Sequence, residues 1–296
     1  MNNFVAYFYK MNINNIICCN HYYSFIYNNY LYHLYEIDNN ININHVININ
    51  KNLIHHTLVS EIIMNKDGNY ISTFNNKNYI LIKILVSDDK KITLNEINDL
   101  ANSLYVEDLN INWGILWSKK IDYLEDLINE NGKKYPIIVD TFNYFVGLAE
   151  NAIAYYNDIV IPNNYKYVIS HKKIRISDSV LTLYNPLNII IDYQVRDIAE
   201  YIKNAFFLNN NKILDELNDY LKINQLSYVD VKLLISRLLY PSFYFDLYED
   251  ILIDGKSERI IIPIIDKLPS FEKYLADIIN YFKRNYNIPE IPWLKN

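Results

Sequence analysis

Two polar residues in the middle of the chain end apolar segments, and their types could carry chemistry. His171 ends the run that begins at Tyr167, and Asp192 ends the next one, Ile189-Ile-Ile. A carboxylate at the end of a buried strand is well placed to hold a hard cation such as Mg²⁺. Alternatively, Asp192 caps the turn that follows it. The sequence leaves both roles open.

A second set of charges indicates a buried ion pair. Arg237 is flanked by apolar residues in Ser236-Arg-Leu-Leu-Tyr-Pro. An arginine in such a setting usually pairs with a carboxylate, so Asp197 or Glu200 is the expected partner. Asp197 also falls in the first turn of an expected helix, where a carboxylate suits the helix dipole. We therefore expect a structural role for Asp197.

The elements that must position these residues begin with strands. Aromatic and β-branched residues at 22–27 and 30–37 flank Asn28-Asn29, which predicts a hairpin because asparagine tolerates positive φ. The other elements expected in this part are a short helix over 50–58, a hairpin of 59–64 and 69–74 around the turn Asn65-Lys66-Asp67-Gly68, and a strand over 79–86.

From about Thr93 the spacing of apolar residues changes from two to three or four, which is typical of helices. Ser227 followed by Asp230 resembles a capping box at the start of one of them. The expected helices cover 94–104, 118–132, 141–157, 196–207, 212–223, 227–239 and 270–286, with one strand pair, 166–171 and 188–193, between them.

This order predicts an α+β fold with a small antiparallel β N-lobe, residues 1–92, and a mainly helical C-lobe, residues 93–296, that contains an inserted strand pair. It is the layout of the protein-kinase-like bilobal fold. The periodicity predicts the order of the helices and strands, but by itself it does not indicate an activity.

Composition narrows the class of protein. The formal net charge of −6 and the pI near 5.5 argue against general nucleic-acid binding. The two cysteines, Cys18 and Cys19, are adjacent and so are expected to be reduced, which favours a cytoplasmic protein. Because no apolar run is long enough to span a bilayer, no membrane association is expected.

Several blocks of sequence resemble one family, the spore-coat kinase-like proteins (the spore coat protein S group), which are relatives of aminoglycoside and choline phosphotransferases. The similar blocks are Trp117–Glu125, Phe142–Ile153, Leu183–Pro186, Arg196–Lys203 and Arg237–Ser242. The resemblance covers about 110 to 245, whereas the N-terminal part agrees only in layout.

The resemblance implies a catalytic loop in which His-x-Asp is followed five residues later by Asn. The loop should begin at His171, which places Lys173 where the family has its catalytic aspartate and Asp178 where it has asparagine. A lysine cannot act as a carboxylate base, and its charge repels Mg²⁺. Asp192 occupies the position of the family's metal-binding aspartate.

The nucleotide-binding lysine has two possible positions. If 59–74 holds the fourth and fifth strands, the third strand is Tyr30–Ile37 and His33 replaces the lysine. If 70–85 is an earlier pair, Lys83 binds phosphate with Glu96 as its helical partner. The first alignment is favoured because it leaves 1–58 for the earlier strands. None of the five glycines forms a GxGxxG loop.

These substitutions predict a catalytically degraded, pseudokinase-like protein with a binding or assembly role. Its partners would be spore-coat or other proteins, and its location the cytoplasm or the coat. The alternative is a weak small-molecule phosphotransferase that uses Mg-ATP. A third reading is a scaffold that binds no nucleotide.

Overall fold

The computed structural model describes residues 1–19, 22–38, 41–54, 60–85, 90–107, 109–174 and 179–294. The chain packs as two compact units. Unit 1 comprises Met1–Tyr105 with Val168–Ile191, and unit 2 comprises Val106–Tyr167 with Asp192–Asn296. The lobe boundary at 92/93 stays a prediction.

The first expected hairpin is confirmed. Strands β2 (Tyr22–Tyr27) and β3 (Tyr30–Ile37) pair in antiparallel register with Tyr27 opposite Tyr30. Asn28 and Asn29 connect them with φ of 49° and 63°, the left-handed conformation that this short turn requires. Asparagine supplies that conformation here in the absence of glycine.

The second expected hairpin is wrong. Strands β4 (Glu61–Ile63) and β5 (Ser72–Phe74) do not pair with each other, and both pair with β6 (Lys77–Ile84). The Asn65 side chain explains this, because its Oδ1 accepts hydrogen bonds from the amides of Asp67 and Asn69 and closes the loop on itself. With β1 (Ile17–Cys18), the sheet order is β1-β2-β3-β6-β4.

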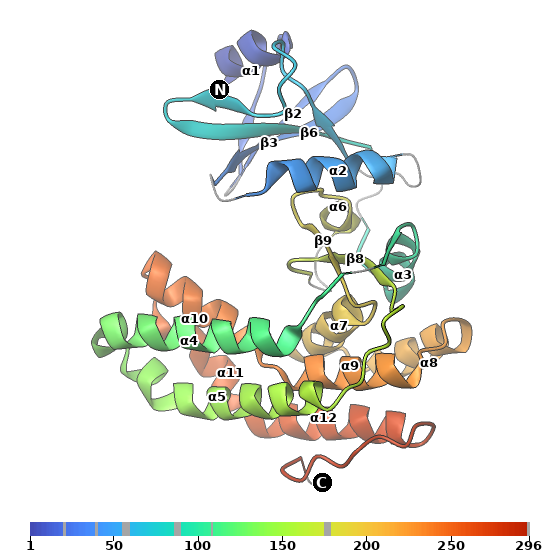
Figure 1. Ribbon diagram of the computed structural model, residues 1–296. Coiled ribbons are helices and arrows are strands. Elements are labelled where there is room, and N and C mark those ends of the chain that lie inside the picture. Colours follow the sequence, from blue (N-terminus) through green and yellow to red (C-terminus); the bar gives the residue numbers. More distant parts are fainter. Residues whose placement is uncertain are drawn as a thin grey trace. The chain divides into compact units, whose positions relative to one another are not determined.

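Each face of this sheet is covered by a helix that the sequence reading missed or misplaced (Figure 1). α1 (Asn2–Tyr9), where no helix was expected, packs Phe4 and Val5 against Leu34 and Leu81. On the other face, α2 (Ile43–Ile54) begins before the expected residue 50. α2 is amphipathic because asparagines separate its isoleucines. Both residue types are poorer helix formers than alanine, so intrinsic propensity alone does not favour a helix here.

Unit 1 also contains α3 (Leu94–Ala101) and α6 (Val180–Leu183). The strand pair expected near 166–171 and 188–193 is confirmed as β8 (Tyr167–His171) and β9 (Ile189–Asp192). With β7 (Tyr105–Val106) they form a second sheet in the order β7-β8-β9. The boundary between the two units falls within these strands.

Unit 2 is helical (Figure 1). α5 packs against α4 and α9, and α9 packs against α7 and α12. The helices are α4 (Trp113–Asn131), α5 (Pro136–Asn157), α7 (Arg196–Phe207), α8 (Ile213–Ile223), α9 (Tyr228–Leu239), α10 (Ser242–Asp254), α11 (Ile262–Asp266) and α12 (Leu268–Lys283), with 3₁₀ turns η1 (Gly132–Lys134) and η2 (Glu258–Ile261).

Local capping explains where some of these helices begin. Ser227 and Asp230 form the expected capping box of α9. α4 begins five residues before the expected Ser118, because the Asn112 side chain accepts a hydrogen bond from the Ile115 amide. α10, which directly follows Pro241, was not expected.

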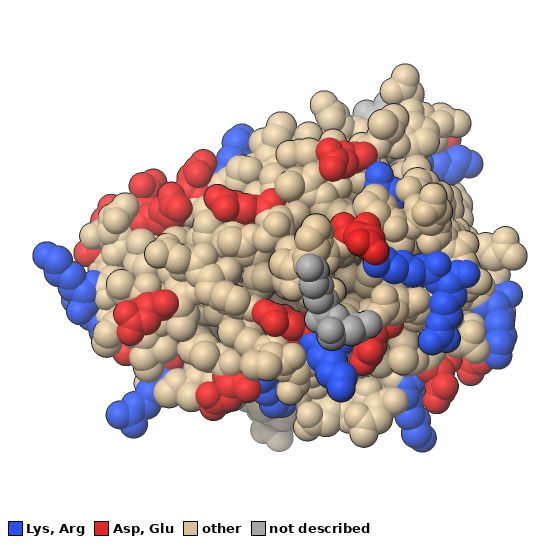
Figure 2. All heavy atoms as spheres, turned by 90° about the horizontal axis from the view of Figure 1, so that it is seen from below, with Lys and Arg blue, Asp and Glu red and all other residues tan. Residues whose placement is uncertain are grey.

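The surface seen in Figure 2 carries Asp and Glu interspersed with Lys and Arg. In the part of the chain that the structure describes, no helix combines the length and the apolar character needed to cross a membrane.

Candidate functional site

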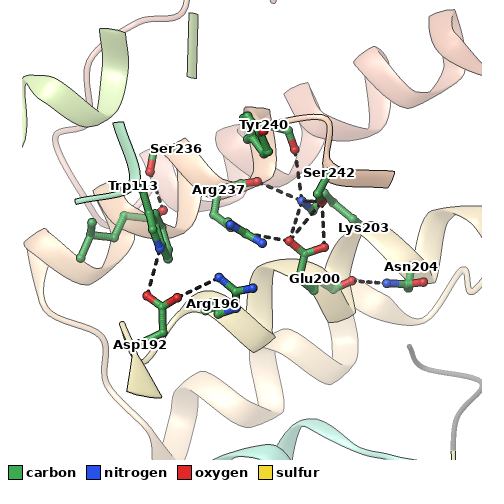
Figure 3. A network of polar contacts seen from close by, with 11 residues as sticks. Trp113, Asp192, Arg196, Glu200, Lys203, Asn204, Ser236, Arg237, Tyr240 and Ser242 are labelled. Atoms are coloured by element: carbon green, nitrogen blue, oxygen red, sulfur yellow. Dashed lines mark hydrogen bonds and ion pairs between the residues drawn. The ribbon is translucent and has the colours of Figure 1, made fainter. Parts of the chain in front are cut away.

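The carboxylate of Asp192 is buried and accepts three hydrogen bonds. Figure 3 draws the two from Trp113 and Arg196. Oδ1 accepts from the indole Nε1 of Trp113 at 2.9 Å and from the backbone amide of Tyr193 at 2.8 Å. Oδ2 accepts from Nη1 of Arg196 at 2.8 Å. Both oxygens are therefore engaged, and the nearest cation is a guanidinium of the same unit.

These contacts do not fit a divalent cation. A metal at Asp192 would have to displace the Arg196 guanidinium or lie beside its positive charge, which repels it. Hard cations also prefer several oxygen ligands. Among the described residues, no three His, Cys, Asp or Glu side chains are grouped so that they could hold a metal ion.

One helical turn further on, Glu200 forms a second buried centre (Figure 3). Its carboxylate accepts from Nε of Arg237 at 2.7 Å and from Nζ of Lys203 at 2.9 Å. The Ser242 hydroxyl lies 3.0 and 3.2 Å from the two carboxylate oxygens. Glu200 is thus the carboxylate partner expected for Arg237, and it joins α7 to α9 and α10.

Lys203 is almost completely buried, yet its ammonium is well supplied with acceptors. Besides Glu200, Nζ contacts the carbonyl oxygens of Arg237 and Tyr240 and the Ser242 hydroxyl. The position of Lys203 within α7 gave no signal of this role. The sequence could not indicate this site, because Lys203 meets its acceptors only once the end of α9 packs against α7.

The charges of this centre shift one another's pKa values. Burial disfavours ionised Glu200, but the positive charges of Lys203 and Arg237 outweigh burial and lower its pKa to about 2. Burial lowers the pKa of Lys203 to about 8, against the attraction of Glu200. At neutral pH the centre therefore holds one carboxylate between two cations.

Aromatic rings line the same centre. The Arg237 guanidinium lies 5.3 Å from the ring centroid of Trp113 and 5.8 Å from that of Trp117. Trp117 in turn stacks on Tyr240 at 4.4 Å. Cation–π contacts of this kind favour a fixed arginine. The arrangement is that of a structural ion-pair network rather than of an exposed catalytic group.

His171, the expected start of the catalytic loop, is buried in unit 1. Its Nε2 lies 2.9 Å from the carbonyl oxygen of Leu183, so Nε2 carries the proton and donates it. This contact ties β8 to the end of α6. It gives His171 a structural role within unit 1, whereas Asp192 belongs to unit 2.

Lys173 is exposed, and its backbone is fixed by Asn188. The Lys173 amide donates to Oδ1 of Asn188 at 3.1 Å, and the Asn188 amide group donates to the Lys173 carbonyl at 2.7 Å. The position where the resemblance places a catalytic base therefore carries an exposed ammonium. Asp178 lies outside the described residues.

His33, on β3, is buried and neutral. Its ring packs 4.4 Å from that of Tyr22, and Nδ1 lies 3.3 Å from the Tyr35 hydroxyl. Burial lowers the pKa of His33 to about 4, so it carries no charge at neutral pH. Asn185 donates to the same Tyr35 hydroxyl at 3.3 Å, and Leu181 and Leu187 pack on this face of the sheet.

Lys83, on β6, lies on the opposite face of the sheet from His33. In the sheet register it lies between Tyr32 and Glu61, whereas its neighbour Ile82 lies opposite His33. Side chains alternate between faces along a strand, so Lys83 and His33 point to opposite faces. The Lys83 ammonium lies 3.7 Å from the ring centroid of Tyr30.

Glu96, the expected partner of Lys83, has other contacts. Its carboxylate forms an ion pair with Lys90 at 2.7 Å and accepts from the Thr93 amide at 2.9 Å as part of the α3 capping box. No ion pair joins Glu96 to Lys83 in the described structure, and the two residues serve separate local roles.

Comparisons with known proteins decide the family. A family model described as "Spore coat putative kinase YutH" matches residues 2–262. The chain belongs to this family. The endospore coat-associated protein YutH of Bacillus subtilis is 26% identical over 208 residues, which are 62% of this chain and 61% of that protein. The alignment therefore spans less than two thirds of the relative.

Solved structures agree with this membership at the level of the fold. An aminoglycoside phosphotransferase from Alicyclobacillus acidocaldarius superposes with a TM-score of 0.63 at 10% identity, over 92% of this chain and 93% of that one. A spectinomycin phosphotransferase, solved with ADP and spectinomycin, gives 0.58 at 11% identity, over 93% and 92%. The kinase-like α+β fold predicted from the order of elements is confirmed.

Proposed function

We propose that this member of the YutH family is a pseudokinase that acts by binding or assembly and not by phosphoryl transfer. The engagement of the Asp192 carboxylate by Trp113, Tyr193 and Arg196 carries the proposal. A carboxylate that already accepts three hydrogen bonds, one of them from a guanidinium, is poorly placed to offer its oxygens to a nucleotide-bound cation.

Two further positions support the proposal. An exposed lysine, Lys173, stands where the resemblance places the catalytic base, and general-base catalysis typically contributes about 10²–10⁴ in rate. His33 stands where the favoured alignment places the nucleotide-binding lysine. It is buried and neutral, so it supplies no positive charge for a phosphate group. The proposal therefore rests on the loss of the base, of the lysine and of Asp192 as a metal ligand, while Asp178, the other position that could hold a metal, lies outside the described residues.

The test is a phosphate-transfer assay with Mg-ATP on the full chain, with ADP release as the readout. We expect no turnover above the background, and the same background in Asp192→Asn, whose fold is checked by circular dichroism. A turnover that Asp192→Asn removes would overturn the proposal.

A weak Mg-ATP-dependent small-molecule phosphotransferase is the alternative. The observation that favours it is the fold shared with phosphotransferases that were solved with nucleotides, among them an amicoumacin kinase with AMP-PNP and Ca²⁺. Thermal-shift titration separates nucleotide binding from turnover. A melting shift at millimolar Mg-ATP without turnover supports a nucleotide-binding pseudokinase, and no shift supports a scaffold without nucleotide.

The proposed location is the spore coat, and the proposed partners are coat proteins. The coat-associated relative from Bacillus subtilis supports this proposal. Immunofluorescence of the tagged protein, produced in sporulating cells of Bacillus subtilis, tests it, since a uniform cytoplasmic signal would contradict it.

A further inference from the structure

Unit 2 contains an aromatic row made of Trp117, Trp113, Tyr193 and Tyr165. The ring centroids of Trp117 and Trp113 lie 5.3 Å apart. Those of Trp113 and Tyr193 lie 4.7 Å apart, and those of Tyr193 and Tyr165 lie 5.4 Å apart. These separations are typical of aromatic rings in contact. Because electron tunnelling weakens steeply with distance, rings this close can exchange an electron readily.

The aromatic row leads from the interior of unit 2 to its surface. The two tryptophans and Tyr193 are buried. Tyr165 is half-buried, and its neighbours in the chain, Asn164 and Lys166, are exposed. An electron vacancy that begins on a buried tryptophan can therefore reach a side chain that dissolved reductants can approach.

The hydroxyl of Tyr165 has a partner that can take its proton. It donates to Oδ1 of Asp230 at 2.5 Å. Oδ2 of Asp230 accepts from the amide and the hydroxyl of Ser227, so these donors are all neutral groups. Burial and the charge of Asp230 raise the pKa of Tyr165, so the phenol stays protonated until it is oxidised. An oxidised phenol is a strong acid, and its proton then moves to the carboxylate.

The surroundings of the tryptophans disfavour an electron vacancy there. The Arg237 guanidinium lies 5.3 Å from the ring centroid of Trp113 and 5.8 Å from that of Trp117. A cation at this distance opposes the removal of an electron from the ring. Asp192 accepts from the Trp113 indole but is paired with Arg196, which makes it a weaker proton acceptor than a carboxylate with neutral donors. The vacancy is therefore more stable on the tyrosine at the surface.

Tyr193 links the tryptophans to the surface and is not itself an end of the aromatic row. Its hydroxyl lies 2.5 Å from the carbonyl oxygen of Ile111 and 2.8 Å from the hydroxyl of Tyr156. Neither of these groups is basic enough to keep the proton of an oxidised phenol. An electron vacancy on Tyr193 therefore keeps its positive charge and moves on to the next ring.

We propose that the aromatic row is an outlet for oxidising equivalents, which carries an electron vacancy from Trp113 and Trp117 to Tyr165. The vacancy arises when a one-electron oxidant, or light, removes an electron from an indole. One electron then passes from Tyr165 through Tyr193 to the oxidised indole, which returns to its closed-shell form. The phenolic proton moves to Asp230, and a neutral tyrosyl radical remains.

A reductant in the solvent completes the cycle. A thiolate donates one electron to the tyrosyl radical and becomes a thiyl radical, while Asp230 returns the proton to Tyr165. The buried tryptophans are thereby spared further oxidation. The proposal goes beyond the function proposed above and does not depend on it.

The experiment uses the full chain with Trp293→Phe, so that Trp113 and Trp117 are its remaining tryptophans. A flash of ultraviolet light absorbed by tryptophan ejects an electron from an indole. A cobalt(III) ammine complex in the solution captures this electron and becomes cobalt(II). Transient absorption then follows the tryptophan and tyrosyl radicals, whose bands differ. We expect the tyrosyl band to grow at the rate at which the tryptophan band decays, and more slowly in D₂O, because the proton moves with the electron.

Two variants in this background interrupt the outlet. Tyr165→Phe should abolish the growth of the tyrosyl band and prolong the tryptophan radical. Asp230→Asn removes the proton acceptor, so we expect slower growth and a smaller effect of D₂O. Circular dichroism checks that each variant keeps its fold.

Tyr274→Phe is the matched control. Tyr274 is also half-buried in unit 2, but its hydroxyl donates to the carbonyl oxygen of Ile202 at 2.7 Å and not to a carboxylate. This variant should leave the rate of growth unchanged. A tyrosyl band that grows equally in Tyr165→Phe, or that is lost equally in Tyr274→Phe, would contradict the proposal, as would the absence of a tyrosyl band when both tyrosines are present.

Discussion

At the scale of residues, the positions that resemble a phosphotransferase centre have acquired other partners. Asp192 binds Trp113 and Arg196, and His171 binds the Leu183 carbonyl. Sequence reasoning found these residues from their place at strand ends. It left metal binding open for Asp192, because Trp113 and Asp192 are far apart in the chain and nothing local in the sequence indicates that they meet.

Asp192 is expected to matter for stability. Asp192→Ala leaves the largely buried Arg196 guanidinium without its partner, so we expect the free energy of unfolding in urea to fall, by up to about 3 kcal/mol. Replacing Arg196 by methionine in the same chain should recover part of this loss. A neutral or stabilising effect of Asp192→Ala alone would contradict the structural role and favour a ligand-binding one.

At the scale of elements, α7 is the part that ties unit 2 together. The start of α7 carries Arg196, which bonds Asp192 on β9, and the middle carries Glu200 and Lys203, which bond α9 and α10. The bounds of α7 followed from periodicity alone. The network did not, because it needs the ends of α9 and α10 to lie against the same helix.

Glu200 gives this network a pH dependence. Its pKa is about 2 in the folded chain and about 4.5 ordinarily, so between these values the unfolded chain binds more protons. Stability from Glu200 is therefore present above about pH 4.5 and lost as the pH falls towards 2. Between pH 2 and 4.5 we expect the free energy of unfolding to vary with pH by up to about 3 kcal/mol less in Glu200→Gln than in the unaltered chain. Urea unfolding at several pH values in this range measures the difference.

The matched control for Glu200→Gln is Asp219→Asn. Asp219 forms an ion pair with Lys222 in which both side chains are mostly exposed, and such pairs contribute little. This variant should keep the slope of stability against pH between 2 and 4.5. An unchanged slope in Glu200→Gln would mean that the network does not hold Glu200 ionised.

At the scale of the whole molecule, the chain packs as two compact units. Chains built in this way often depart from two-state unfolding. All three tryptophans, Trp113, Trp117 and Trp293, lie in unit 2, so tryptophan fluorescence reports on that unit. Far-ultraviolet circular dichroism reports on both.

We expect Leu34→Ala, a fully buried position of the unit 1 sheet, to lower the midpoint of the dichroism transition more than that of fluorescence. Truncating a buried leucine usually costs about 2–5 kcal/mol. Leu234→Ala, fully buried in unit 2, is the control and should shift the fluorescence midpoint. Equal shifts of both probes in both variants would show a single cooperative transition.

The sequence by itself determined the α+β class, the Asn28-Asn29 hairpin, the β8–β9 pair and most helices of unit 2, because periodicity, turn residues and caps act over a few residues. The tertiary structure decided which strands pair with β6, which face of the sheet carries His33 or Lys83, and which donors surround Asp192. Those outcomes depend on packing between segments far apart in the chain, for which a single sequence carries no local signal.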